Sequence, residues 1–148
     1  MKPLGWRLAL VLIAAAQAAI GLWGLVAPHS FYNDFPGLGH HWVAPLGPYN
    51  EHLVRDHAAS ELGFAALLVA TAIWWERRLV LVAGTAFLVA TVPHFAYHLT
   101  TTDSLSTADN GVSLGLFALE ILVVGGAMLS VLSTRPDTAA SHKRPKVL

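Results

Sequence analysis

Histidine and glutamate residues recur at helical spacing inside three apolar stretches of the sequence. His57 and Glu61 are four residues apart, as are His94 and His98, so each pair shares one face if its segment is helical. Glu120 is the one charged residue of a further apolar stretch. Ionisable side chains are costly to place in lipid, so we expect these five to face one another inside a helical bundle.

Several kinds of chemistry fit these five residues. In the first, they form a polar core in which they satisfy one another's hydrogen bonds, with the pairs His57–Glu61 and His94–Glu120. In the second, they hold a transition metal, because imidazole and carboxylate suit zinc, iron and copper. A narrower version of the metal hypothesis is a haem b held between His57 and either His94 or His98. A proton relay, or a small-molecule pocket with Glu61 as general acid and base, is a further alternative.

Other polar residues are weaker candidates for the same pocket. Gln17 interrupts the first apolar run, and we expect it to be a hydrogen-bonding partner of the glutamates. Asp56 adjoins His57 and either orients a histidine or remains an exposed acid at the start of a helix. The adjacent His40 and His41 are expected to be solvated rather than ligands.

Four long apolar runs must position these side chains. We predict helices over about residues 8–27, 53–75, 79–99 and 111–132, each close to the roughly 20 residues that cross a hydrocarbon core of about 30 Å. In lipid, the backbone polar groups of such runs must be satisfied internally, which favours helices. The predicted fold class is therefore all-α, an integral membrane up-down four-helix bundle formed by residues 1–133.

The overall composition excludes several classes of protein. Of the 148 residues, 55% are hydrophobic and 12% are charged, which is not the composition of a disordered chain. The net charge is zero, so no nucleic-acid partner is predicted. The chain has no cysteine, which excludes a disulfide scaffold, a cysteine-ligated iron–sulfur cluster and thiol catalysis.

Lysine and arginine are distributed unevenly among the segments between the runs. Arg55 alone falls on the side that we take as external, and the other basic residues fall on the opposite side, which predicts cytoplasmic N- and C-termini. These other residues are Lys2, Arg7, Arg77, Arg78, Arg135, Lys143, Arg144 and Lys146. The first run is long for a signal peptide, so we expect a retained helix, with cleavage after residues 16–18 as the alternative.

Two segments lie outside the predicted spans. Residues 28–50 form a long external loop rich in aromatic residues, Gly and Pro, which we expect to fold over the mouth of the bundle or to lie in the interface. Asn50 is predicted to cap the second helix, and Glu51 to pair with Arg55. Asp109 or Asn110 is predicted to cap the fourth helix. Residues 134–148 form a basic cytoplasmic tail that we predict to be disordered.

The chain resembles the small four-helix DoxX-like membrane proteins over about residues 6–133. The resemblance rests on Gly-Leu-Trp-Gly-Leu-Val-Ala-Pro at residues 21–28, on Arg55-Asp56 and on Glu61-Leu62-Gly63. Residues 47–52 and 93–98 do not belong to that general pattern and point to a narrower group within it. The resemblance implies a four-helix bundle in a bacterial plasma membrane, sometimes as a partner of redox enzymes, and it supplies no catalytic residues.

Taken together, these patterns predict a small membrane protein with an outward-facing polar pocket. The leading hypothesis is a non-catalytic accessory or binding protein, with the lipid bilayer and a membrane redox protein or another protein as partners. The alternatives are a redox or hydrolytic membrane enzyme that depends on a metal or haem, and a proton-coupled transporter, which at this length would need an oligomer.

Overall fold

The computed structural model describes residues 3–133, and within them the fold is helical. It contains five α-helices and a short 3₁₀ turn, together with a pair of two-residue antiparallel strands. In chain order these elements are α1 (Pro3–Val26), α2 (Pro28–Asp34), β1 (Pro36–Gly37), β2 (His40–His41), η1 (Ala44–Leu46), α3 (Glu51–Trp74), α4 (Arg77–Thr100) and α5 (Thr107–Ser133). The predicted tail, residues 134–148, lies outside the described residues, as does Lys2.

The four long helices match the four predicted runs, but each begins two to five residues earlier than the run. The remaining elements form the loop between α1 and α3. The prediction described this segment only as a folded loop and gave it no helix or strand. The short helix α2 begins at a proline, which fits the first turn of a helix because the missing N–H has no partner there in any case.

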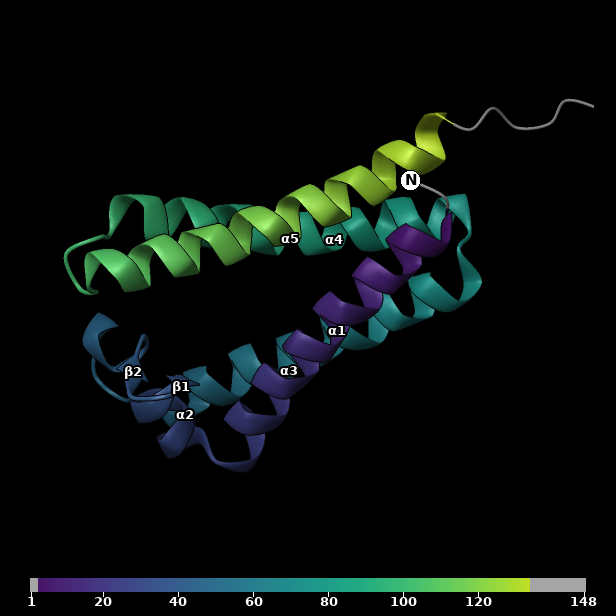
Figure 1. Cartoon of the computed structure of the whole chain (residues 1–148). Coiled ribbons are helices and arrows are strands. Elements are labelled where there is room, and N and C mark those ends of the chain that lie inside the picture. Colours follow the sequence, from purple (N-terminus) through teal and green to yellow (C-terminus); the bar gives the residue numbers. More distant parts are fainter. Residues whose placement is uncertain (1–2, 134–148) are drawn as a thin grey trace, which may run out of the picture.

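The long helices are arranged as two pairs. α1 packs along α3, and α4 packs along α5, whereas contacts between the pairs are fewer. Figure 1 shows the pairs close together near the turn between α3 and α4 and diverging toward the opposite end, where α2 and the strands lie. The start of α1 and the end of α5 lie at the convergent end (Figure 1).

The apolar core lies where the pairs converge. Phe87 and Leu68 are almost completely buried there, with Leu10 from α1 and Val124 from α5 beside them. α1 and α3 approach closely at Gly21, where an added Cβ would lie only 2.7 Å from the carbonyl oxygen of Ala58. The small side chain is therefore required for this helix contact.

Polar interactions fix the helix ends. The Asn50 side chain accepts a hydrogen bond from the backbone N–H of Leu53, and Arg55 lies 2.8 Å from Glu51, as predicted. The Arg7 guanidinium donates to the carbonyls of Ala72 and Ile73. These carbonyls belong to the last turn of α3, where no intrahelical donor remains, so Arg7 stabilises that helix end.

The start of α5 differs from the prediction. Helix α5 begins at Thr107, and the Ser106 hydroxyl accepts from the backbone N–H of Asp109. The capping residue is therefore Ser106, and the predicted Asp109 or Asn110 lies inside the helix. The Asn110 amide instead donates to the carbonyls of Thr102 and Leu105, which ties the preceding loop to α5.

The outer surface of the bundle is apolar. The four long helices contain 24, 24, 24 and 27 residues and are apolar enough to cross a membrane. At about 1.5 Å per residue, each is at least ~36 Å long. Large apolar side chains such as Leu12, Leu122 and Leu129 are about 70% exposed. Exposed apolar surface of this extent is what a lipid-facing protein presents.

Candidate functional site

A cavity of about 600 Å³ lies between the two helix pairs, on the side of the outer loop. Apolar and aromatic side chains make up most of its wall, and every α-helix contributes to it. The polar and ionisable side chains that line it are Gln17, His57, Ser60, Glu61, Thr91, His94, His98, Ser113 and Glu120. All five ionisable residues of the sequence prediction are therefore in one cavity.

Helix α3 contributes His57 and Glu61 from successive turns of one face. The Nδ1 atom of His57 lies 3.6 Å from Oε1 of Glu61, so the predicted pair is present as a loose contact. The Glu61 side chain is 14% exposed, and its second oxygen, Oε2, is buried. Within residues 3–133, no hydrogen-bond donor reaches Oε2.

Helix α4 contributes two imidazoles that contact each other. The Nε2 atoms of His94 and His98 are 3.2 Å apart, so one ring donates its N–H to the other. His98 is 7% exposed, and its other nitrogen, Nδ1, is buried without a hydrogen-bond partner among the described residues. The His57 ring lies edge-on to His94, with centroids 6.1 Å apart, so the three imidazoles form a row from α3 to α4.

Helix α5 completes the wall with Phe117 and Glu120. The Phe117 ring stacks on His98, with centroids 5.4 Å apart, and lies 4.7 Å from the His94 centroid. The Glu120 carboxyl is close enough to that of Glu61 for their charges to interact. The predicted His94–Glu120 pair is not formed in the described part of the chain, because His94 contacts His98 instead.

The two weaker candidates have different outcomes. Gln17 is buried on α1 and lines the cavity, where it faces the same space as the glutamates. Asp56 is 62% exposed, lies 3.3 Å from Nε2 of His52, and does not line the cavity. Adjacent residues on a helix point about 100° apart, so Asp56 cannot share the direction of His57. The prediction of Asp56 as a pocket residue is wrong.

The outer loop closes one end of the cavity, which is the first of the two positions expected for it. Phe31, Phe35 and Trp42 line it, and their rings are in contact with one another. The loop is fastened to α5 at Asp109, whose Oδ1 accepts from Trp42 Nε1 at 2.9 Å and lies 2.7 Å from His40 Nδ1. We call these contacts of Asp109 the loop latch.

The sequence interpretation missed the part that these loop residues play in the site. The density of aromatic residues in 28–50 was the available signal, but it does not show which rings point inward. His40 is engaged in the latch and His41 contacts the carbonyl of Asn33, so neither of them reaches the cavity.

The positions of the side chains do not support a metal centre. Within the part of the chain that the structure describes, no group of three or more His, Asp or Glu side chains converges to hold one ion. The His94–His98 hydrogen bond occupies one nitrogen of each ring, which leaves fewer ring nitrogens available to ligate a metal. Haem ligation stays a prediction that these positions do not test.

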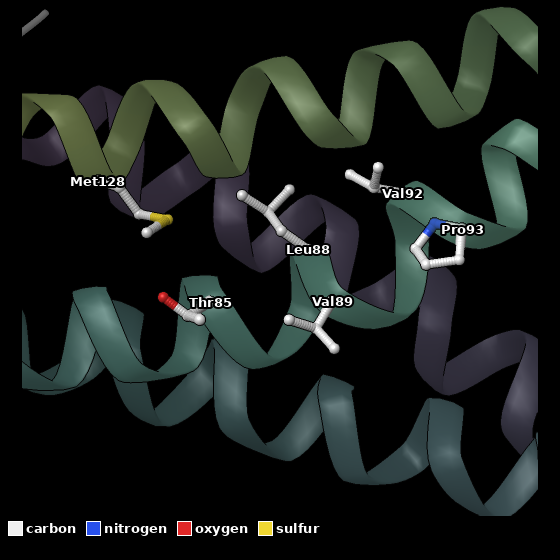
Figure 2. A pocket seen from close by; sticks show the side chains of 6 residues that line it. All are labelled: Thr85, Leu88, Val89, Val92, Pro93 and Met128. Carbon is white, nitrogen blue, oxygen red and sulfur yellow. The ribbon is translucent and has the colours of Figure 1, made fainter.

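A second hollow, of about 430 Å³, lies along α4 beside α5 (Figure 2). Thr85 is its one polar side chain, and the others are apolar, including Pro93 and Met128. Pro93 therefore faces this hollow. Helix α4 is not interrupted at Pro93 and continues to Thr100. No ionisable side chain lines this hollow, and an apolar surface of this kind suits contact with lipid chains.

The chain was compared with protein-family models, curated proteins and solved structures. None of the three comparisons found a match. The DoxX-like resemblance therefore stays a prediction, and what the site does must be argued from its own geometry.

Proposed function

We propose that this chain is a multi-pass membrane protein that binds a small organic molecule in the cavity between its helix pairs. The bound molecule has an apolar body and a hydrogen-bonding head. The protein acts as a binding or accessory protein of a bacterial plasma membrane rather than as a catalyst. One observation carries this proposal, namely that the cavity contains buried polar atoms, Glu61 Oε2 and His98 Nδ1, that no described residue satisfies.

The unsatisfied atoms argue against a purely structural polar core. A buried polar atom without a partner costs about 1–3 kcal/mol, and most such atoms in native proteins are paired. A core built only for stability would bring a donor to Glu61 Oε2, for example from Gln17 or Thr91, which line the same cavity. A ligand that supplies the missing partners accounts for the arrangement.

The size and lining of the cavity support the same proposal. Small-molecule sites commonly have volumes of about 300–1,000 Å³, with mostly apolar walls and a few convergent polar groups. The cavity has about 600 Å³, with the aromatic loop residues at one end and the His/Glu cluster on the walls. A molecule bound there has its head among the imidazoles and carboxyls and its body against the rings.

Helix length and charge support the membrane assignment and the orientation. Among the described residues, Arg7, Arg77 and Arg78 lie toward the convergent end of the bundle, and Arg55 lies at the start of α3 toward the opposite end. Positive charge is retained on the cytoplasmic side, so the convergent end and both termini are assigned to the cytoplasm. The cavity then opens toward the outer side.

The binding hypothesis is tested by calorimetry on the purified full chain in phosphatidylcholine nanodiscs. Phenylbutanol is the probe, because it combines an apolar ring with a hydroxyl head, and empty nanodiscs correct for partitioning into lipid. We expect saturable binding of one molecule per chain, lost in Ala90→Trp, which fills the cavity. The control is Ala96→Trp, on the same helix but outside the cavity lining.

Two results would count against this function. Heat that never saturates beyond that of empty nanodiscs means that the cavity does not bind the probe. Equal binding by the Ala90→Trp and Ala96→Trp variants means that the probe binds elsewhere.

A further inference from the structure

We infer that the ligand of the cavity is a lipophilic amine, bound as its ammonium ion. The inference rests on the proposed function and names the chemical class of the molecule. The ammonium N–H groups donate to Glu61 Oε2, with Glu61 and Glu120 as the counter-charge. The apolar part of the amine packs against the aromatic wall.

The charge of the cavity selects the sign of the ligand. Among the described residues, no Lys or Arg lines the cavity, and the carboxyl groups that can carry negative charge there are those of Glu61 and Glu120. Their charges interact with each other, and two carboxylates brought together in a poorly hydrated space repel. A cation between them is attracted to both carboxylates and offsets their repulsion, whereas an anionic head would be repelled by them.

The hydrogen-bonding capacity of the cluster selects a donor. Glu61 Oε2 is an acceptor that lacks a donor. When His98 Nε2 donates to His94 Nε2, His98 Nδ1 is an acceptor as well, and it too lacks a donor. An ammonium head offers several N–H donors and no acceptor, and therefore meets this need. Hydrogen bonds between charged groups are about twice as strong as neutral ones.

The aromatic wall suits the rest of such a molecule. Phe117 stands beside the imidazoles of His94 and His98, and Phe31 lies 6.5 Å from the His57 ring. A cation within about 6 Å of a ring face is attracted by the negative face of that ring. The same rings provide apolar contact for a hydrocarbon body, so the head and the body are both accommodated at one place.

The test compares three probes with the same apolar body and different heads: phenylbutylamine, phenylbutanol and phenylbutanoate. Calorimetry on the full chain in phosphatidylcholine nanodiscs gives each dissociation constant at neutral pH. We expect the amine to bind about tenfold more tightly than the alcohol, and the carboxylate to bind more weakly than either. The zwitterionic lipid keeps surface charge from favouring the amine.

Variants then locate the charge that is responsible. Glu61→Gln is expected to remove the preference for the amine while alcohol binding remains. Glu51→Gln is the matched control, because Glu51 is on the same helix and exposed, and lies outside the cavity. If Glu61→Gln fails to fold, the order of the three probes on the unaltered chain still decides the question, and Glu120→Gln provides the second variant.

The possible results separate the two proposals. Amine binding no tighter than alcohol binding, or tightest binding of the carboxylate, overturns the amine inference and leaves the binding pocket in place. Binding of none of the three probes overturns both. Loss of the preference in Glu51→Gln as well as Glu61→Gln attributes it to overall charge and overturns the inference.

Discussion

Gly21→Ala tests the close contact of α1 with α3, which holds one wall of the cavity in place. The added Cβ would lie 2.7 Å from the Ala58 carbonyl oxygen and 2.7 Å from Leu62 Cγ. Carbon atoms prefer separations of about 3.5–4.0 Å, so α1 must move away from α3 by several tenths of an ångström or more. Part of this clash is with backbone, which cannot rotate away, so we expect an overpacking cost of about 1–3 kcal/mol.

The helix propensity of alanine acts in the opposite direction and must be separated from the clash. Replacing glycine by alanine inside a helix stabilises it by about 0.5–1 kcal/mol. Gly63→Ala carries the same gain, because Gly63 lies within α3 and nothing is within 4 Å of its added Cβ. The difference between the two variants therefore isolates the clash, and Gly21→Ala should be less stable by about 1–3 kcal/mol.

Denaturant titration of the two variants in mild detergent micelles, followed by tryptophan fluorescence, measures this difference. We expect Gly63→Ala to unfold at a higher denaturant concentration than the unaltered chain and Gly21→Ala at a lower one. Equal stabilisation of both variants would show that α1 and α3 do not approach closely at Gly21, and would refute the packing described above.

Two further predictions concern the loop and the orientation. Asp109→Ala removes the loop latch, and the amides of the outer loop, including Trp42 N–H, should exchange with deuterium about tenfold faster, as expected for the loss of roughly 1.4 kcal/mol of local stability. Asp103→Ala is the control, and equal exchange in both variants would show that the latch does not hold the loop. The chain has no cysteine, so single cysteines report orientation directly. In intact cells, Leu38→Cys should react with a membrane-impermeant maleimide, and Arg78→Cys should react only after permeabilisation. The reverse pattern would invert the assigned topology.

The long helices could be predicted from the sequence because their signal is strong and local. Apolar runs of about 20 residues have few alternatives, and contacts within one helix follow from spacing alone. Both predicted pairs on α3, His57 with Glu61 and Glu51 with Arg55, are present. Ionisable side chains are costly in lipid, so the five ionisable residues could be assigned to the interior of the bundle, where they line one cavity.

Contacts between helices were harder to predict, because the sequence does not give the rotation of each helix about its axis. The sequence predicted a pair of His94 with Glu120, yet His94 contacts His98. Small residues are typical of close contacts between membrane helices, and Gly21 lies at such a contact. Gly111 and Gly115 do not, because nothing lies within 4 Å of a Cβ added at either position.

The loop was the least predictable part of the site. Its aromatic content indicated a position over the mouth of the bundle or in the interface, but the latch joins Trp42 to Asp109, residues 67 positions apart. No local pattern specifies a contact of that length. Asp109 was assigned to helix capping because Asp is common there, whereas the structure gives the cap to Ser106. Asp109 accepts from the Ser106 hydroxyl through Oδ2 and holds the loop through Oδ1.

The position of a bound probe shows whether the cavity between the helix pairs is the binding site. With isotope-labelled protein in micelles, intermolecular nuclear Overhauser effects report which side chains lie beside phenylbutanol. We expect effects from the probe to the rings of Phe117 and Trp42, which line the cavity. Effects confined to side chains on the outer surface, such as Leu122 and Leu129, would contradict it.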